Sequence, residues 1–287
     1  MEAMGAIFFF ILGTIIGSFL NVVIFRYNTG KTLWDRSRCF ACGGIISWYN
    51  LIPIVSFILL RARCHSCKSK FSSEYPLVEA ISGFLFLLVF LKFIKEFGFD
   101  YALTLAGVLW LTDVLAIISL LIIIAAYDLK HKIIPDLFAF LFGVASFIHL
   151  FLPKFSVASF HFPRFIDLSA GPILALPIFL LWLVSRGRWI GLGDAKLVLG
   201  VGWFLSLGFG VSAVTIGFWL GAVIGLLGIA IGKYRRLTIF RKLLLNFGLK
   251  NLTMVSELPL APFLIAGLLI VYFSNWDVVG LVSLLNF

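Results

Sequence analysis

The stretch AMGAIFFFILGTIIGSFLNVVIF, from Ala3 to Phe25, decides the class of fold. Only small or polar residues interrupt this apolar run, and it exceeds the roughly 20 residues that a helix needs to cross a bilayer. No basic segment precedes it, because the first cation, Arg26, follows it. A cleaved secretory signal has the opposite charge bias. We therefore expect a retained transmembrane helix with its N-terminus outside and Arg26 on the cytoplasmic side.

The whole chain has the composition of a membrane protein. Of its 287 residues, 62% are hydrophobic and 13% are charged, whereas a soluble domain is about half apolar and a quarter charged. This composition excludes an ordinary soluble enzyme, a disordered protein and a collagen-like one. Together with the first run, the later apolar runs predict about eight spans. These later runs are roughly Leu77–Phe93, Leu103–Tyr127, Leu137–Leu152, Leu168–Ser185, Ala195–Phe209, Val211–Ile231 and Leu258–Phe273.

The positions of the basic residues support this layout. If the spans alternate from an outside N-terminus, all but four of the 23 Lys and Arg residues fall on the cytoplasmic side, as the positive-inside rule requires. We attribute the net charge of +10 to this topology and to contact with anionic membrane lipids. No basic cluster lies on a recognisable nucleic-acid-binding fold, so we expect no nucleic-acid partner. The four exceptions are Lys92, Lys95, Lys154 and Arg164.

All four cysteines lie in the polar segment after the first span, as the pairs Cys39-x-x-Cys42 and Cys64-x-x-Cys67. Two such pairs at this separation are a strong zinc-ribbon signal, because each pair places two thiolates on one ion. Two disulfides or free thiols are the alternatives, and the reducing cytoplasmic side disfavours disulfides. With four thiolates the zinc site is closed, so we interpret it as structural.

Two aspartates stand at the cytoplasmic ends of predicted spans. Asp128 closes the third span, and Asp194 opens the sixth within Gly191-Leu192-Gly193-Asp194. Taken singly, Asp128 could be a solvated interfacial charge, and Asp194 could be a helix N-cap. Together they lie at one membrane depth, where two neighbouring carboxylates share a proton and can activate water as an aspartic protease does. Asp136 is interpreted as the cap of the fourth span.

At this point the chain resembles the bacterial type IV prepilin peptidases, which are intramembrane aspartic proteases of the Gly-x-Gly-Asp type. Any one of the motifs is weak, but their order and spacing are specific. The resemblance covers nearly the whole chain. It is carried by Gly17–Arg26, both cysteine pairs, Trp48–Pro53, Arg61–Cys64, Tyr75–Glu79, Asp128, Pro135-Asp136, Gly191–Lys196 and Leu258–Phe263.

The resemblance implies a membrane endopeptidase that removes the short basic leader of type IV prepilins or pseudopilins after a glycine, on the cytoplasmic face of the bacterial inner membrane. It makes Asp128 and Asp194 the catalytic pair. It also implies N-methylation of the new N-terminal residue, usually phenylalanine, with S-adenosylmethionine. This sequence departs from the family pattern at Ala261, where glycine is usual, and at Lys130, where an acidic residue is common.

Two residues are candidates for binding the methyl donor. Asn21 and Glu79 are polar groups near the cytoplasmic ends of their spans. Hydrogen bonds between helices are the alternative role for both. The chain carries no dinucleotide fingerprint, because no strand precedes Gly191-Leu192-Gly193.

The sequence thus predicts an all-α polytopic membrane protein with about eight transmembrane helices and a small cytoplasmic zinc-ribbon-like insertion. The expected division is a first transmembrane helix (1–25), a four-cysteine zinc-binding segment associated with methyl transfer (26–76) and a helical protease core (77–287). A transporter or channel that relays protons through Asp128 and Asp194 is a rival function, but it leaves the cysteine pairs unexplained. A non-catalytic scaffold of a secretion machine is a second rival.

Overall fold

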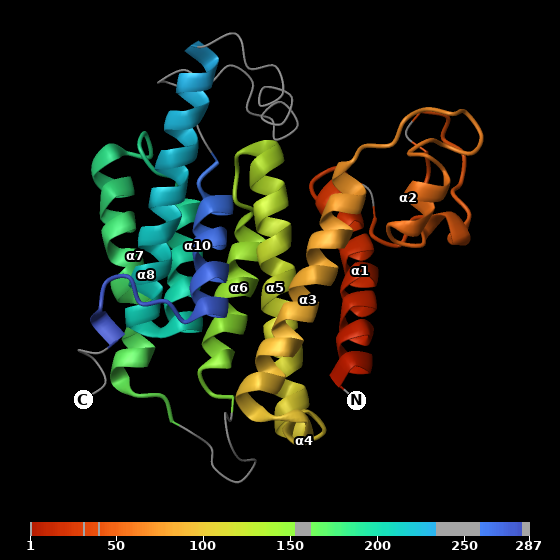
Figure 1. Cartoon of the computed structure of the whole chain (residues 1–287). Helices are drawn as coiled ribbons and strands as arrows, with labels where there is room; N and C mark the ends of the chain where they lie inside the picture. The colour runs from red at the N-terminus through yellow and green to blue at the C-terminus, as the bar shows by residue number, and fades with distance from the viewer. Residues whose placement is uncertain (1, 31, 40, 153–161, 234–258, 283–287) are drawn as a thin grey trace. The chain divides into compact units, whose positions relative to one another are not determined.

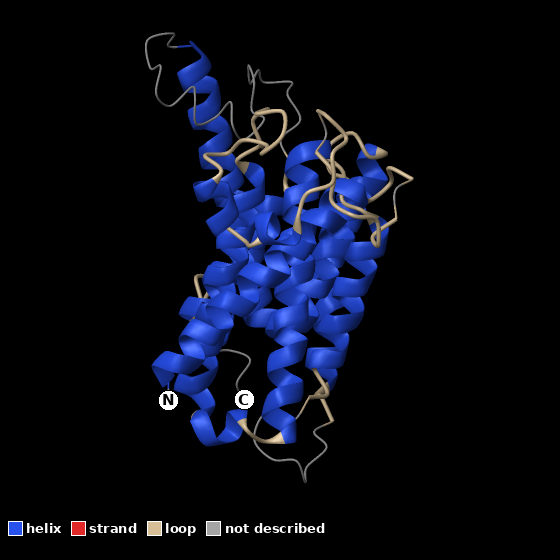
Figure 2. Ribbon diagram, turned by 90° about the vertical axis from the view of Figure 1, so that its right-hand side faces the viewer, coloured by secondary structure: helices blue, strands red, loops and turns tan. Residues whose placement is uncertain are grey.

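The computed structural model describes residues 2–30, 32–39, 41–152, 162–233 and 259–282. Lys154, Leu258 and nearly all of the predicted cytoplasmic loop 232–257 lie outside these residues. In the described ranges the chain is helical and has no strand beyond two isolated bridges (Figure 2). The helices are α1 (Glu2–Arg26), η1 (Trp48–Leu51), α2 (Val55–Leu59), α3 (Glu74–Phe97), α4 (Phe99–Ala102), α5 (Leu105–His131), α6 (Asp136–His149), α7 (Phe165–Ser185), α8 (Leu192–Lys233) and α10 (Ala261–Ser274).

Five of these helices, α1, α3, α5, α7 and α8, are long and apolar enough to cross a membrane. Helices α6 and α10 are apolar but have only 14 residues each. Because α8 is divided internally, the described helices account for the eight predicted apolar segments. The prediction of a polytopic all-α membrane protein is confirmed. The chain falls into two compact units, Met1–Ile123 and Ile124–Phe287, and α5 runs across their boundary.

In the first unit, α1 and α3 lie side by side (Figure 1). Their backbones approach closely at two glycines of α1. A Cβ atom on Gly13 would lie 2.6 Å from the carbonyl oxygen of Ser82, and one on Gly17 would lie 2.8 Å from the Cα of Glu79. Small residues at four-residue spacing allow such contacts between helices in lipid.

The outer face of α1 carries large apolar side chains instead. Ile7, Phe8 and Ile11 are more than half exposed, although α1 also buries Gly13 and Asn21. A soluble helix would turn its large apolar side chains to the core and its polar ones outward. Large apolar side chains on an exposed face are expected of a helix that lipid covers.

In the second unit, α8 packs against α6, α7 and α10 (Figure 1). It is interrupted at Ser206, whose φ of 65° and ψ of 175° are not helical. A Cβ atom on Gly210 would lie 3.5 Å from the Cα of Gly202, although eight residues of a straight helix span about 12 Å. The chain therefore reverses at Ser206, four residues before the break expected at Gly210, and α8 contains both predicted spans.

The structure also resolves the ends of two predicted spans. A short helix, α4, precedes α5 at the start of the third span. The interpretation of Asp136 as the cap of the fourth span is wrong, because the N-cap is Pro135 and Asp136 is the first residue of α6. Its carboxylate instead forms an ion pair of 2.6 Å with Lys196.

Replacing Ser206 with glycine should stabilise the protein. The conformation of Ser206 belongs to a region populated essentially by glycine, where another residue costs about 1–3 kcal/mol. Glycine itself costs about 0.5–1 kcal/mol in conformational entropy. We expect Ser206→Gly to raise the midpoint of thermal unfolding in detergent, and Ser206→Ala to give no such gain. A lower midpoint for Ser206→Gly would contradict this account of the reversal.

Candidate functional site

Asp128 lies in the last turn of α5 and is 4% exposed. Its Oδ2 atom accepts a hydrogen bond of 3.2 Å from the backbone N–H of Ala261, the first residue of α10. The first N–H groups of a helix have no partner within the helix. The carboxylate of Asp128 therefore accepts a hydrogen bond from one of these unpaired N–H groups. In return, this bond offsets part of the cost of burying the carboxylate.

Asp194 lies in the first turn of α8 and is 8% exposed. Its Oδ2 atom accepts a hydrogen bond of 3.2 Å from the N–H of Gly191, which precedes the helix. The side chain therefore reaches back to the capping residue, as the third residue of a capping box does, rather than being the N-cap itself. The carboxylates of Asp194 and Asp128 are close enough for their charges to interact.

The loop between α5 and α6 holds the start of α8 beside Asp128. A Cβ atom on Gly193 would lie 2.8 Å from the Cβ of Ile134, closer than real side-chain contacts, so only glycine fits at this position. On the same side of the loop, the ion pair between Asp136 and Lys196 joins α6 to α8. The Gly-x-Gly-Asp sequence thus brings its aspartate to the other carboxylate through close backbone packing.

The four cysteines of the first unit form a group that could hold a metal ion, since their Sγ atoms all lie within 4.8 Å of one another. The Sγ atoms of Cys39 and Cys67 are 3.8 Å apart. Four sulfurs arranged tetrahedrally about 2.3 Å from one zinc ion are separated by about 3.8 Å. The predicted clustering of the cysteines is therefore confirmed. His65 is exposed and lies outside the group.

Each cysteine pair sits in the same kind of tight turn. The first cysteine of each pair donates its N–H to the carbonyl five residues later, Cys39 to Gly44 at 2.9 Å and Cys64 to Ser69 at 2.8 Å. Hydrogen bonds from the backbone N–H of Cys42 and the hydroxyl of Ser69 lower the pKa of the Cys39 thiol to about 6. The thiolate is the form that binds metal. The two turns therefore bring the four sulfurs together.

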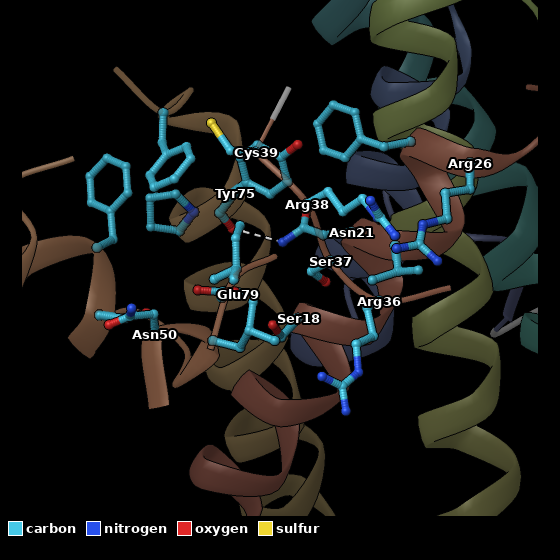
Figure 3. A pocket seen from close by; sticks show the side chains of 18 of the residues that line it. Ser18, Asn21, Arg26, Arg36, Ser37, Arg38, Cys39, Asn50, Tyr75 and Glu79 are labelled. Carbon is cyan, nitrogen blue, oxygen red and sulfur yellow. Dashed lines mark hydrogen bonds between the residues drawn. The ribbon is translucent and has the colours of Figure 1, made fainter. Parts of the chain in front are cut away.

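A cavity of about 710 Å³ lies beside the cysteines in the first unit (Figure 3). This volume is within the range of about 300–1,000 Å³ found for small-molecule sites. Its wall is formed by α1, α3 and the segment between them, and it includes Cys39. Asn21 and Glu79, the candidates from the sequence, both line it. Its other chemically notable residues are Ser18, Phe25, Arg26, Arg36, Arg38, Phe57, Phe71 and Tyr75.

Some features of this cavity could not be found from the sequence. In the sequence, Arg36 and Arg38 served only to indicate which side of the membrane their segment lies on. The ring of Phe25 stacks on that of Tyr75, with centroids 4.5 Å apart, although the two residues are far apart in the chain. Ile54 has a φ of 59° and donates its N–H to Glu79. The only sequence signal for this turn is Pro53 before it.

Comparisons with known proteins match both units. Residues 11–93 match the bacterial peptidase A24 N-terminal domain, and residues 115–226 match the type IV leader peptidase family. Three curated relatives carry the name prepilin leader peptidase/N-methyltransferase. The protein of Neisseria gonorrhoeae is 31% identical, over 75% of this chain and 78% of its own length. That of Vibrio cholerae is 28% identical, over 96% and 98%.

The third relative, from Myxococcus xanthus, is 35% identical over 77% of this chain. The match spans 62% of that protein, which is less than two thirds of its length. No solved structure matches the chain.

The contact between Gly193 and Ile134 can be tested by overpacking it. Gly193→Ala should lower the stability of the protein by about 1–3 kcal/mol, because the added methyl group has no space. The measurement is the midpoint of thermal unfolding in detergent. Adding Ile134→Ala should restore most of the loss by making room for it, and Ile134→Ala alone serves as the control. Equal stability of Gly193→Ala and the wild type would contradict the packing described.

Proposed function

Because the chain belongs to the type IV leader peptidase family, we propose that it removes the leader from type IV prepilins or pseudopilins, with Asp128 and Asp194 as the catalytic pair. One observation carries the assignment. The two buried carboxylates come from different helices of the second unit, and their charges interact. Ionisable groups inside apolar helices are costly, so they mark functional sites.

The hydrogen bonds suggest different roles for the two oxygens of each carboxylate. The backbone donors Ala261 and Gly191 both contact Oδ2 atoms. We assign the Oδ1 atoms to the reaction. One carboxylate, ionised, takes a proton from a water molecule as that water attacks the scissile carbonyl. The other, protonated, donates to the carbonyl oxygen. The first carboxyl then gives this proton to the leaving nitrogen, while the second carboxylate takes a proton back from a hydroxyl of the tetrahedral intermediate. The carbon–nitrogen bond breaks, which releases the leader with a new carboxyl end and the mature chain with a new amine.

The substrate of this reaction is an apolar helix with a short basic leader. In the proposal it enters from the lipid and leaves its leader at the cytoplasmic face, where the positive-inside rule places the ends of α5 and α8. The segment at the scissile glycine must unwind to expose a peptide bond, which glycine makes easier. Asp136 is not a free acid for the basic leader, because it is paired with Lys196.

A second reaction is proposed for the cavity of the first unit, namely N-methylation of the new N-terminal residue. The relatives are named N-methyltransferases, and S-adenosylmethionine supplies the methyl group when bound. The cavity fits such a ligand in volume, in the aromatic surface of Phe25 and Tyr75, and in the guanidinium groups of Arg36 and Arg38. The guanidinium groups suit a carboxylate of the ligand.

We assign zinc to the four cysteines, with a structural role. Four thiolates leave no open position on a tetrahedral ion. The segment between α1 and α3 contains only short helices, and a segment of this size needs a staple in place of a core. Since Cys39 and Gly43 belong to the wall of the cavity, the metal would maintain the methyl-transfer site.

Asp128→Asn and Asp194→Asn should each lower the rate of leader cleavage by about 10²–10⁴-fold or more, because each removes a proton-transfer group. The assay is cleavage of a prepilin by the purified chain in lipid, resolved by mass. Asp167→Asn is the matched control, since among the described residues the Asp167 side chain pairs with the largely exposed Arg164, and such pairs contribute little. Both single variants cleaving at the wild-type rate would overturn the assignment.

The purified chain should contain about one zinc ion, and the double variant Cys39→Ser/Cys42→Ser should contain none. Methyl transfer should fall in this variant, because the wall of the cavity loses its staple, whereas leader cleavage should persist. His65→Ala is the control and should keep its metal, because His65 is exposed. Metal is measured by elemental analysis, and both reactions are scored separately. Metal-free wild-type protein would exclude the zinc assignment.

A further inference from the structure

Two polar residues line the cavity at the end that the neighbouring membrane helices α1 and α3 form. Asn21 lies five residues before the end of α1, and Glu79 lies five residues after the start of α3. At about 1.5 Å per residue, both lie about 7–8 Å inside their helix ends. Gly17 allows α1 to contact the Cα of Glu79. The side chains of Asn21 and Glu79 therefore both enter the wall of the cavity at this distance from their helix ends, and Figure 3 shows them in it.

Asn21 presents an unused acceptor at this end. The residue is 3% exposed, and its amide nitrogen donates a hydrogen bond of 3.0 Å to the carbonyl oxygen of Tyr75. A carbonyl oxygen can only accept, which fixes the orientation of the amide. Its Oδ1 atom is buried and has no hydrogen-bond partner among the described residues. Buried polar atoms are normally paired, so the cavity lacks a donor here.

Glu79 contributes a carboxyl group to the wall of the same cavity. It is 8% exposed, and its Oε2 atom accepts a hydrogen bond of 2.8 Å from the N–H of Ile54. The hydroxyl of Ser18 is a second partner. One N–H and one hydroxyl do not occupy all the acceptor positions of a carboxylate.

The N–H that contacts Glu79 is held by a strained turn. Ile54 has a φ of 59° and a ψ of −49°, and Val55 donates its N–H to the carbonyl of Pro53 across it. This is the rare form of the γ-turn, and a positive φ is a genuine outlier for a β-branched residue. Such strain concentrates at functional sites. The turn therefore fixes the carboxylate of Glu79 in one position.

We propose that Asn21 and Glu79 bind a primary amine, namely the free N-terminal amine of the processed pilin-like chain, and that Glu79 accepts its proton. This inference rests on the methyl-transfer part of the proposed function. An ammonium group offers only donors, and the cavity offers an orphan acceptor and a carboxylate at this end. A substrate whose next residues are apolar brings its amine to the membrane interface, where these side chains lie.

The reaction balances with this assignment. The ammonium group gives one proton to the carboxylate of Glu79, which leaves a lone pair on nitrogen. The nitrogen–carbon bond forms as the bond between the methyl carbon and sulfur breaks, and the sulfur keeps that electron pair. The product is a secondary ammonium, and the proton on Glu79 passes to water. Asn21 holds the second hydrogen of the amine and orients its lone pair.

The amino group of the methyl donor has the same chemistry, so the experiment must separate the two sources. The full chain in lipid nanodiscs is given a peptide with a free N-terminal phenylalanine followed by apolar residues. The variants are Glu79→Gln and Asn21→Leu, which have similar shapes to the native side chains. Glu74→Gln is the matched control, because Glu74 is exposed on the same helix and does not line the cavity. Leader cleavage is measured in parallel.

Glu79→Gln should lower kcat of methyl transfer by about 10²-fold or more, and Asn21→Leu should raise KM for the peptide. Raising the pH from about 6.5 to 9 should restore part of the Glu79→Gln rate, because a free α-amine has an ordinary pKa of about 7.7–8.0. Binding of S-adenosylhomocysteine and leader cleavage should not change. Wild-type transfer by Glu79→Gln would overturn the inference. If the variants also lose binding of S-adenosylhomocysteine, Asn21 and Glu79 bind the methyl donor and not the peptide amine, which likewise overturns the inference.

A binding measurement separates failure of this inference from failure of the methyl-transfer proposal. Wild-type protein should bind the free-amine peptide at least about tenfold more tightly than its N-acetylated form, and Glu79→Gln should abolish this preference. If the wild type transfers no methyl group but shows the preference, methyl transfer is wrong and the amine site stands. If the wild type shows no preference, the amine site is wrong whatever the rate of methyl transfer.

Discussion

Burial of carboxylates among apolar helices is the constraint on which the rest of this structure depends. Among the described residues, three carboxylates are buried, and each accepts a backbone N–H at the start of a helix. Glu79 binds the N–H of Ile54 before α2, Asp128 that of Ala261 in α10, and Asp194 that of Gly191 before α8. Helix starts offer unpaired donors and a favourable dipole. The hydrogen bond that offsets the burial of each carboxylate thus also ties its helix to a neighbouring segment of the chain.

Under the proposed function, this arrangement also accounts for two separate reactions in one chain. In each unit, backbone N–H groups occupy one side of the carboxylate and leave its remaining oxygen for a substrate. The charges of Asp128 and Asp194 interact, and in the proposal this pair performs hydrolysis with activated water. Glu79 instead lines one cavity together with the neutral amide of Asn21, which suits an amine. The surrounding elements position each site. Gly193 of α8 packs closely beside the aspartates, and the four-cysteine segment between α1 and α3 forms part of the wall beside Glu79.

Much of this structure could be predicted from the sequence, because lipid imposes simple rules on composition. The apolar runs predicted the helices, and the spacing of the cysteines predicted their cluster. The catalytic pairing of Asp128 and Asp194 stays a prediction, although both carboxylates are buried as expected of such a pair. Local features set by packing could not be predicted. Ser206 bears the reversal of α8 although Gly208 and Gly210 follow it. The strained turn at Ile54 and the orphan oxygen of Asn21 depend on contacts between distant segments.

The central claim is that Asp128 and Asp194 act as one catalytic unit. The most direct test compares leader cleavage by the two single Asp→Asn variants with cleavage by the double variant, using a radiolabelled prepilin to measure low rates. Residues that act as a unit are strongly non-additive. The double variant should therefore be no slower than the slower single variant. If the fold-reduction in the cleavage rate of the double variant equals the product of the two single fold-reductions, the carboxylates act independently. That result would contradict this account.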